Sequence, residues 1–174
     1  PYKGKKNIVI AFHYACEAKS GTWEIKELSV KEGAPTVEPE TPDTPSTGDT
    51  TTPNGNFETW VDGKPNNWKT ASTACNATLT QSTDAHNGKY SVKVGGSTTA
   101  NKRLGYKEME LKAGTYKIKY YVKAGTATGA SVQSGFVDIT AEGKAGNYVY
   151  SGYINDIPNT KWTLVEQELV IPSD

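Results

Sequence analysis

The chain lacks an excess of charge of either sign, because its 19 Lys and Arg residues balance its 19 Asp and Glu residues. Nucleic acids and acidic membrane surfaces are recognised by clustered Lys and Arg side chains. The only such cluster, Lys3, Lys5 and Lys6, is short and is interpreted as the solvated start of a strand. The sequence also lacks a run of about 18 apolar residues, the signature of a membrane span. We therefore expect neither a nucleic-acid partner nor insertion into a membrane.

Cysteine and histidine are scarce, which argues against metal and catalytic sites built from them. Cys16 and Cys75 lie far apart, outside any CxxC motif and without His or Asp at ligand spacing. They are either buried free thiols or a single disulfide. His13 and His86 have no Ser or Cys nucleophile in a recognisable context. A glycosidase needs two carboxylates that flank a cleft, whereas the acidic residues here are typical of exposed strand faces, so we expect no enzymatic activity.

Residues 34–53, APTVEPETPDTPSTGDTTTP, are predicted to be a linker. Proline recurs among Thr and acidic residues, with almost no apolar side chains. Such a composition favours extended polyproline conformations and cannot bury enough surface to fold. Its reach is at most roughly 60 Å, and linkers of this kind join the modules of secreted and surface proteins. The chain starts at Pro1 without a targeting segment, so we expect a piece of a longer protein.

Two strands are predicted before the linker. In KNIVIAFHY, apolar residues occur on both alternating phases, which is typical of a strand buried on both faces. In GTWEIKELSV, Trp23 and Ile25 share one phase whereas Leu28 and Val30 take the other. This phase change predicts a β-bulge near Lys26-Glu27. Two strands do not make a stable domain, so they must belong to a larger unit.

After the linker the pattern is all β. In LKAGTYKIKYYVKAG, Tyr116, Ile118, Tyr120 and Val122 alternate with a polar face that carries Tyr121 among lysines. This alternation predicts a half-buried antiparallel strand with its tyrosines Tyr116 and Tyr120 in the core. Tyr121 is expected to be exposed or covered by a second element. Further strand candidates with Gly, Asn or Asp turns between them are 77–81, 90–94, 103–111, 132–140, 147–154 and 161–171. Together they predict an all-β sandwich of the jelly-roll or Greek-key type.

An ordered series of motifs carries a family resemblance. It extends over about 120 residues, roughly the length of one domain. The motifs are NGNFE (54–58), WVDGKPNNW (60–68), AHNGKYSVKV (85–94), LKAGTYKIKYYVKAG (111–125) and KWTLVEQELVIP (161–172). The series resembles the galactose-binding-like jelly-roll modules that include several carbohydrate-binding module families. Such modules are frequent in secreted and surface proteins of Bacteroidetes-type bacteria. The resemblance implies a jelly-roll β-sandwich at residues 54–174, which here stops before the family's closing strands and is therefore expected to be truncated at its C-terminus.

Residues 1–33 are similar to the closing strands of a choice-of-anchor J type jelly-roll. They are either the end of a preceding module or strands that complete the sandwich of residues 54–174. We favour the first alternative. A pairing of residues 6–14 with 161–171 would support the second.

The resemblance also implies one structural calcium ion, since sandwiches of this type often hold Ca²⁺ between the first and last strands. Ca²⁺ takes six to eight oxygen ligands. Glu58 of NGNFE matches the acidic position of the family's opening motif, and carbonyl groups near residues 86–88 would add oxygens. The family's closing Asp is replaced by Glu27, which we take as the second carboxylate ligand.

Aromatic side chains are the remaining candidates for function. A pyranose ring stacks its C–H face on Trp or Tyr while its hydroxyl groups hydrogen-bond to polar side chains. Phe57 and Trp162 are expected to face the core, and Trp68 is expected to be structural. The candidate ligand-binding residues are Trp60, Tyr106, Tyr148, Tyr150 and Tyr153.

These observations lead to one functional hypothesis and one alternative. The hypothesis is non-catalytic binding of a polysaccharide or other glycan, by an accessory module of a secreted or surface glycan-processing protein. Its partners would be the glycan and the neighbouring domains, and its place extracellular, at the cell surface or in the periplasm. The alternative is a structural or adhesive spacer without a glycan ligand, because this fold hosts many functions.

Overall fold

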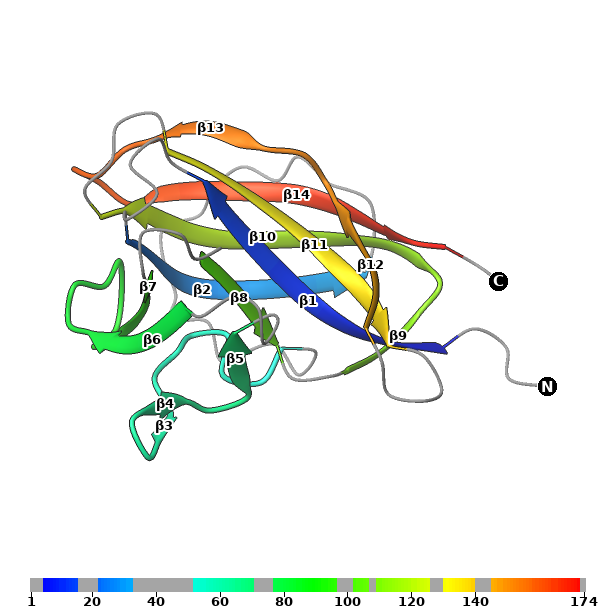
Figure 1. Cartoon of the computed structure of the whole chain (residues 1–174), viewed down its shortest axis with the longest axis horizontal. Coiled ribbons are helices and arrows are strands. Elements are labelled where there is room, and N and C mark those ends of the chain that lie inside the picture. Colours follow the sequence, from blue (N-terminus) through cyan, green and yellow to red (C-terminus); the bar gives the residue numbers. More distant parts are fainter. Residues whose placement is uncertain are drawn as a thin grey trace.

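Strands account for all regular secondary structure in the part of the chain that the computed structural model describes. The described residues are 5–15, 22–32, 52–70, 77–96, 102–106, 109–125, 130–139 and 145–172. Their strands form two antiparallel sheets that face each other, and a short hairpin of β3 (Trp60–Val61) and β4 (Lys64–Pro65) projects beside them (Figure 1). The prediction of an all-β sandwich is confirmed. The predicted linker and both cysteines lie outside the described residues, except for Thr52 and Pro53.

The first sheet has seven strands. Five follow one another as β12 (Ala145–Tyr150), β11 (Ala130–Ile139), β1 (Lys5–Ala15), β8 (Lys102–Tyr106) and β5 (Trp68–Thr70). Two shorter strands extend it: β13 (Ile154–Ile157) pairs with β11, and β9 (Met109–Lys112) pairs with β1.

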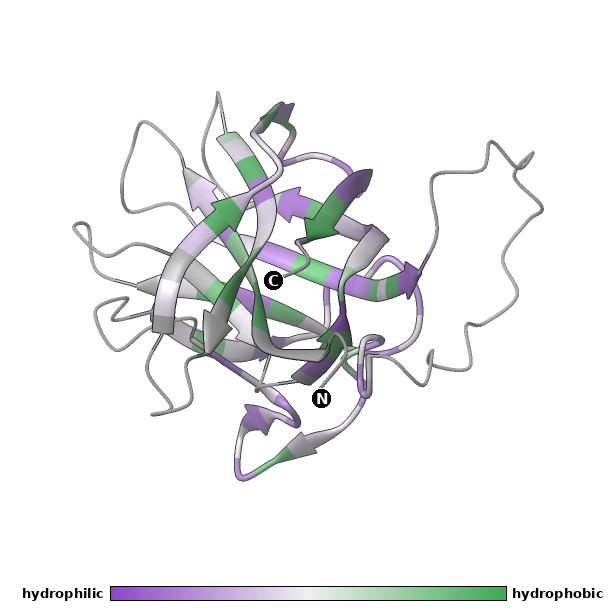
Figure 2. Cartoon of the chain, turned by 90° about the vertical axis from the view of Figure 1, so that its right-hand side faces the viewer, coloured by the Kyte–Doolittle hydropathy of each residue, from purple (hydrophilic) through white to green (hydrophobic). Residues whose placement is uncertain are grey.

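The second sheet has five strands, in the order β14 (Thr163–Ile171), β10 (Gly114–Ala124), β2 (Trp23–Glu32), β7 (Ser91–Gly96) and β6 (Ala77–Ser82). Consecutive strands cross repeatedly between the two sheets, as from β7 to β8 and from β10 to β11. Figure 2 shows the alternation of apolar and polar residues along these strands, which places one face of each sheet toward the other and one toward solvent.

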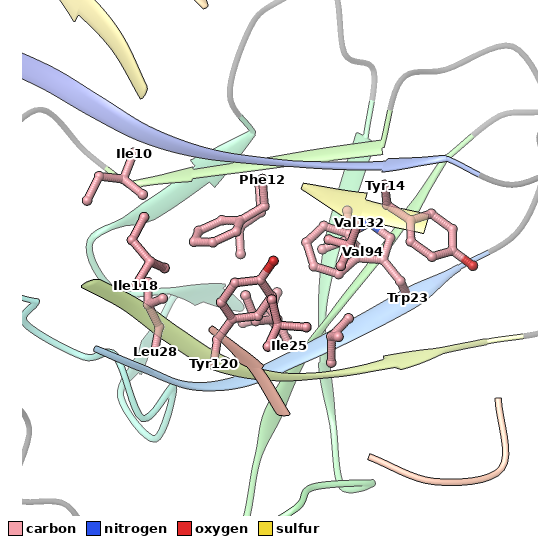
Figure 3. Packing of buried hydrophobic residues seen from close by; sticks show 14 of the residues in the cluster. Ile10, Phe12, Tyr14, Trp23, Ile25, Leu28, Val94, Ile118, Tyr120 and Val132 are labelled. Carbon is pink, nitrogen blue, oxygen red and sulfur yellow. The ribbon is translucent and has the colours of Figure 1, made fainter. Parts of the chain in front are cut away.

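The core lies between the sheets and is rich in aromatic side chains. Figure 3 shows Phe12 of β1 pointing toward Tyr120 of β10, and the two rings meet edge to face with centroids 5.0 Å apart. Phe12 also contacts Trp68, which in turn packs on Phe57. All four are buried, as is Tyr116. The predicted inward face of β10 and the structural roles of Phe57 and Trp68 are therefore confirmed.

The first two strands of the chain occupy the centre of the two sheets. β1 lies between β11 and β8, and β2 lies between β10 and β7. β1 pairs with β11 from Ile8↔Asp138 to Ala15↔Ser131, whereas β14 pairs with β10 and not with β1. The pairing of residues 6–14 with 161–171, which would have supported the second alternative, is thus absent among the described residues, although β1 and β2 share the core of the sandwich. The domain boundaries, and the resemblance of residues 1–33 to a preceding module, stay predictions.

The predicted β-bulge is present in β2. Its register against β10 shifts between Lys119 and Tyr121, so that two residues of β2, Glu27 and Leu28, oppose a single residue of β10. Glu27 adopts a left-handed conformation with φ 53°. The extra residue restores the inward phase for Leu28 after Ile25. Lys26, which pairs with the outward Tyr121, and Glu27, which contacts His86, point away from the core.

Candidate functional site

Aromatic and polar side chains gather on the outer face of the seven-stranded sheet. Directly paired residues in neighbouring strands share a face, and the register pairs Val137 with Tyr148, Gly135 with Tyr150 and Gln133 with His13. The alternate residues of β1 and β11, such as Phe12 and Val132, belong to the core. His13, Gln133, Tyr148 and Tyr150 therefore point away from the core, and we call this set, with Tyr153, the tyrosine face.

Tyr148 and Tyr150 form the centre of the tyrosine face. Their rings are nearly parallel, with an interplanar angle of 6° and centroids 5.7 Å apart. Both side chains are half-buried. Gly135 of the neighbouring strand makes room for them, because a methyl group there would overlap the Val149 carbonyl oxygen and lie 2.6 Å from Cδ1 of Tyr150. The ring of Tyr150 thus lies against the backbone of β11.

His13 joins the third tyrosine to the face. Its Nδ1 lies 3.1 Å from the Tyr153 hydroxyl and 3.4 Å from Nε2 of Gln133. Which of these groups donates depends on the imidazole tautomer. The His13 ring also lies 5.9 Å from the rings of both Tyr150 and Tyr153. Tyr153 is 42% exposed, which leaves polar groups at the edge of the aromatic surface.

A buried glutamine fixes the segment that carries Tyr153. Nε2 of Gln167 donates to the Gly152 carbonyl at 2.7 Å, while Oε1 accepts hydrogen bonds from the backbone N–H and the hydroxyl of Ser134. The Ser151 N–H donates to the Ser134 carbonyl. Gly152 has φ 96°, a conformation that favours glycine. These contacts hold the loop between β12 and β13 in one geometry.

The structure does not bring the candidate residue Trp60 to this face. Trp60 lies in the β3–β4 hairpin, well away from β12 (Figure 1). Its ring packs partly on the core, and its indole N–H donates to the Phe57 carbonyl at 2.8 Å. The backbone of Tyr106 pairs with Trp68, but its side chain is outside the described part of the structure. Sequence reasoning missed His13 and Gln133, although the outward phase of His13 in KNIVIAFHY was a usable signal.

A second aromatic group lies on the outer face of the five-stranded sheet. The Tyr121 ring stacks on His86, with centroids 3.7 Å apart, so of the two alternatives for Tyr121 the structure shows cover by a second element. The Trp162 indole donates to Asp84 Oδ1 at 3.2 Å, and the Lys123 ammonium pairs with the same carboxylate and lies 5.6 Å from the Trp162 ring centre. The hydrogen bond from Lys123 lowers the pKa of Asp84, despite its partial burial.

These contacts dock the loop of residues 83–90 onto the sheet. The expectation that Trp162 faces the core was wrong: it directly precedes the first residue of β14, and its indole lies on the outer face.

The two carboxylates assigned to calcium bind different partners. Glu58 accepts from the Lys26 ammonium and from the backbone N–H groups of Lys89 and Tyr90 at 3.0 and 3.2 Å. Glu27 Oε2 lies 3.2 Å from Nδ1 of His86. Within the described ranges, no group of three or more His, Cys, Asp or Glu side chains is arranged to hold a metal ion.

Comparison with known proteins identifies a family. The family model described as "Carbohydrate binding domain" (CBM_4_9) matches residues 51–174. Among the curated proteins and the solved structures, none matches this chain. The described residues contain no helix of the length and hydropathy that a membrane span requires.

Proposed function

The chain belongs to the carbohydrate binding domain family, and from this premise we propose that its tyrosine face is the surface that binds the glycan. The observation that carries the proposal is the pair Tyr148 and Tyr150, whose rings lie nearly parallel, 5.7 Å apart, on an outward sheet face. Aromatic rings held in this way by a rigid sheet offer their apolar surface to a sugar without further ordering.

The polar neighbours supply the groups that a sugar's hydroxyls require. A phenol hydroxyl such as that of the exposed Tyr153 donates and accepts, and the His13 imidazole that contacts it is a second polar group on this face. Because these groups lie beside the aromatic rings, one bound sugar can stack on a ring and hydrogen-bond at its rim. This combination of apolar surface and few polar groups is typical of small-molecule sites.

The family consists of binding domains, so the expectation that this domain is not an enzyme is confirmed. We extend the proposal to its context: an accessory module that attaches a glycan-processing protein to its polymer, outside the cell or at its surface. The Pro- and Thr-rich composition of residues 34–53 supports a place among other domains. The spacer alternative is not favoured, because the match is to a binding family.

The test is binding of the purified chain to plant, host and microbial polysaccharides, by glycan array and by retardation in affinity gels. We expect retardation by at least one polymer, which Tyr148→Ala and Tyr150→Ala should each weaken roughly two- to twelve-fold, since aromatic stacking contributes about 0.5–1.5 kcal/mol. Tyr121→Ala is the matched control, because its ring stacks on His86 on the opposite sheet and its loss should leave binding unchanged.

Two results would contradict the proposal. The first is the absence of retardation by every polymer. The second is binding that survives both tyrosine substitutions but is lost with Trp60→Ala, which would move the site to the β3–β4 hairpin.

A further inference from the structure

A buried lysine lies where the family resemblance implies a calcium ion. Lys26 is only 1% exposed, and its ammonium donates to three oxygens: the carbonyls of Asn56 and Tyr90, both at 2.6 Å, and Oε1 of Glu58. These oxygens come from two segments that are far from Lys26 in the sequence. The ammonium therefore joins β2, the opening stretch NGNFE and the loop before β7 at one point.

The β-bulge of β2 builds the first half of this arrangement. Lys26 points outward like its partner Tyr121, and the bulge that follows it leaves the Leu28 N–H free of the ladder to donate to the Gly55 carbonyl at 2.8 Å. The backbone at Gly55 approaches β2 so closely that a side chain there would overlap the Leu28 carbonyl. This contact brings the Asn56 carbonyl to the lysine.

Glu58 and Gly88 build the second half. Burial raises the pKa of Glu58, but the hydrogen bonds from Lys26, Tyr90 and Lys89 and the charge of Lys26 outweigh it, so the net pKa lies below its usual value. Gly88 packs directly on the ion pair: a methyl group there would overlap the Glu58 carboxylate and lie 3.0 Å from the lysine nitrogen.

The donor set fits an ammonium ion and does not fit Ca²⁺. A lysine ammonium has three N–H donors, and the three described oxygens use all of them. Ca²⁺ would need six to eight oxygens, whereas here one carboxylate and two carbonyls converge. The second carboxylate, Glu27, faces His86 instead. A buried charge is costly unless it is paired and hydrogen-bonded, and this lysine meets both conditions.

We propose that the Lys26 ammonium serves as the structural cation of this domain, so that the sandwich closes on an internal ion pair and does not depend on Ca²⁺. The same oxygens form a latent calcium site that one substitution opens. A Ca²⁺ ion bound to an aspartate at position 26, with a Ca²⁺–oxygen distance of about 2.3–2.6 Å, would lie about as far from the backbone as the lysine nitrogen does. Lys26→Asp would therefore place a Ca²⁺ ion against Glu58 and both carbonyls.

The experiment measures the melting temperature of the full 174-residue chain in EDTA, in millimolar CaCl₂ and in millimolar MgCl₂. The wild type is expected to melt at one temperature, within about 1 °C, in all three. Lys26→Met should melt roughly 6–20 °C lower in all three, because it leaves the Glu58 carboxylate without its partner. Lys26→Asp should be destabilised in EDTA and recover with CaCl₂ but not with MgCl₂, which demands a smaller octahedral site.

Three results would overturn the proposal. A wild-type chain that CaCl₂ stabilises or EDTA destabilises binds the metal in spite of Lys26. A Lys26→Met variant as stable as the wild type would show that the ammonium does not close the fold. A Lys26→Asp variant that folds but ignores CaCl₂ would show that these oxygens do not form a cation site. If Lys26→Asp does not fold, the melting temperatures of the wild type and of Lys26→Met still decide the proposal.

Discussion

Gly135 offers a direct test of the geometry of the tyrosine face. It is buried in β11, and its lack of a side chain allows Tyr150 and the adjacent Val149 carbonyl to approach the strand. Gly135→Ala would place a methyl group over that carbonyl and 2.6 Å from Cδ1 of Tyr150. Since a backbone carbonyl cannot rotate away as a flexible side chain can, β12 must shift relative to β11.

The cost of this shift can be bounded from a matched position. Gly95 is likewise a buried strand glycine, but a methyl group there would make only contacts of 3.4 and 3.5 Å, to Thr78 and Thr22. Both substitutions gain about 0.4–1 kcal/mol because alanine restricts the unfolded chain. Only Gly135→Ala also incurs the cost of overpacking, about 1–3 kcal/mol. The two variants should therefore differ by about 1–3 kcal/mol, or roughly 2–12 °C in melting temperature.

Urea denaturation and thermal melting of both variants provide the assay, with polysaccharide retardation measured in parallel. We expect Gly95→Ala to match or exceed the wild type in stability and to bind as it does. Gly135→Ala should be less stable and bind more weakly, because the Tyr150 ring is displaced. Equal stability of the two variants would refute the close packing of Tyr150 on β11.

Three further predictions concern the core and the ion pair. Phe12→Ala should cost about 3–5 kcal/mol in urea denaturation, because the ring is fully buried between the two sheets. Gly88→Ala should be more destabilising than Gly63→Ala in thermal melts: both have φ near +70°, but only Gly88 contacts the Lys26–Glu58 pair. Because the pKa of Glu58 is lowered from 4.5 in the folded state, its charge stabilises the fold above about pH 4.5, and this contribution is lost as the pH falls through the lower folded value. The stability of Glu58→Gln should therefore fall below that of the wild type above about pH 4.5 and approach it in stronger acid, as measured by melting temperature against pH.

Each of these predictions has an outcome that would contradict it. A Phe12→Ala change worth less than about 1 kcal/mol would place β1 outside the core. Equal decreases in the melting temperature of Gly88→Ala and Gly63→Ala would mean that only backbone strain destabilises Gly88→Ala. A stability gap for Glu58→Gln that stays constant from neutral pH to pH 2 would show that its carboxylate does not titrate with folding.

Local alternation in the sequence was sufficient to predict the strands that have one buried face. The inward set of β10, with Tyr116 and Tyr120, follows from a period of two, since residues two apart share a face whatever the strand order. The bulge at Lys26-Glu27 followed from a change of phase within one segment. These features depend only on residues that are close in the chain.

Features that depend on strand order could not be predicted in the same way. His13 reaches Gln133 and Tyr153 only because β1 lies beside β11, and nothing in either segment alone specifies that pairing. The burial of Lys26 could not be predicted, because the two segments that contact its ammonium group are 30 and 64 positions away. The orientation of Trp162 was wrongly predicted because the residue lies just before the first residue of β14. The alternation within the strand therefore did not specify which face its side chain takes.

The central positions of β1 and β2 also affect how the chain reaches its fold. Both strands precede the other described strands, yet the partners of β1 include β11 and those of β2 include β10, in the second half of the chain. Large sequence separation between partners slows folding, because long loops must close before contacts form. Until β11 is made, the apolar segment Ile8–Phe12 has at least one unpaired edge and is open to pairing with other chains. Expression at low temperature or with chaperones should therefore raise the soluble yield of this domain more than that of a sandwich with local pairing.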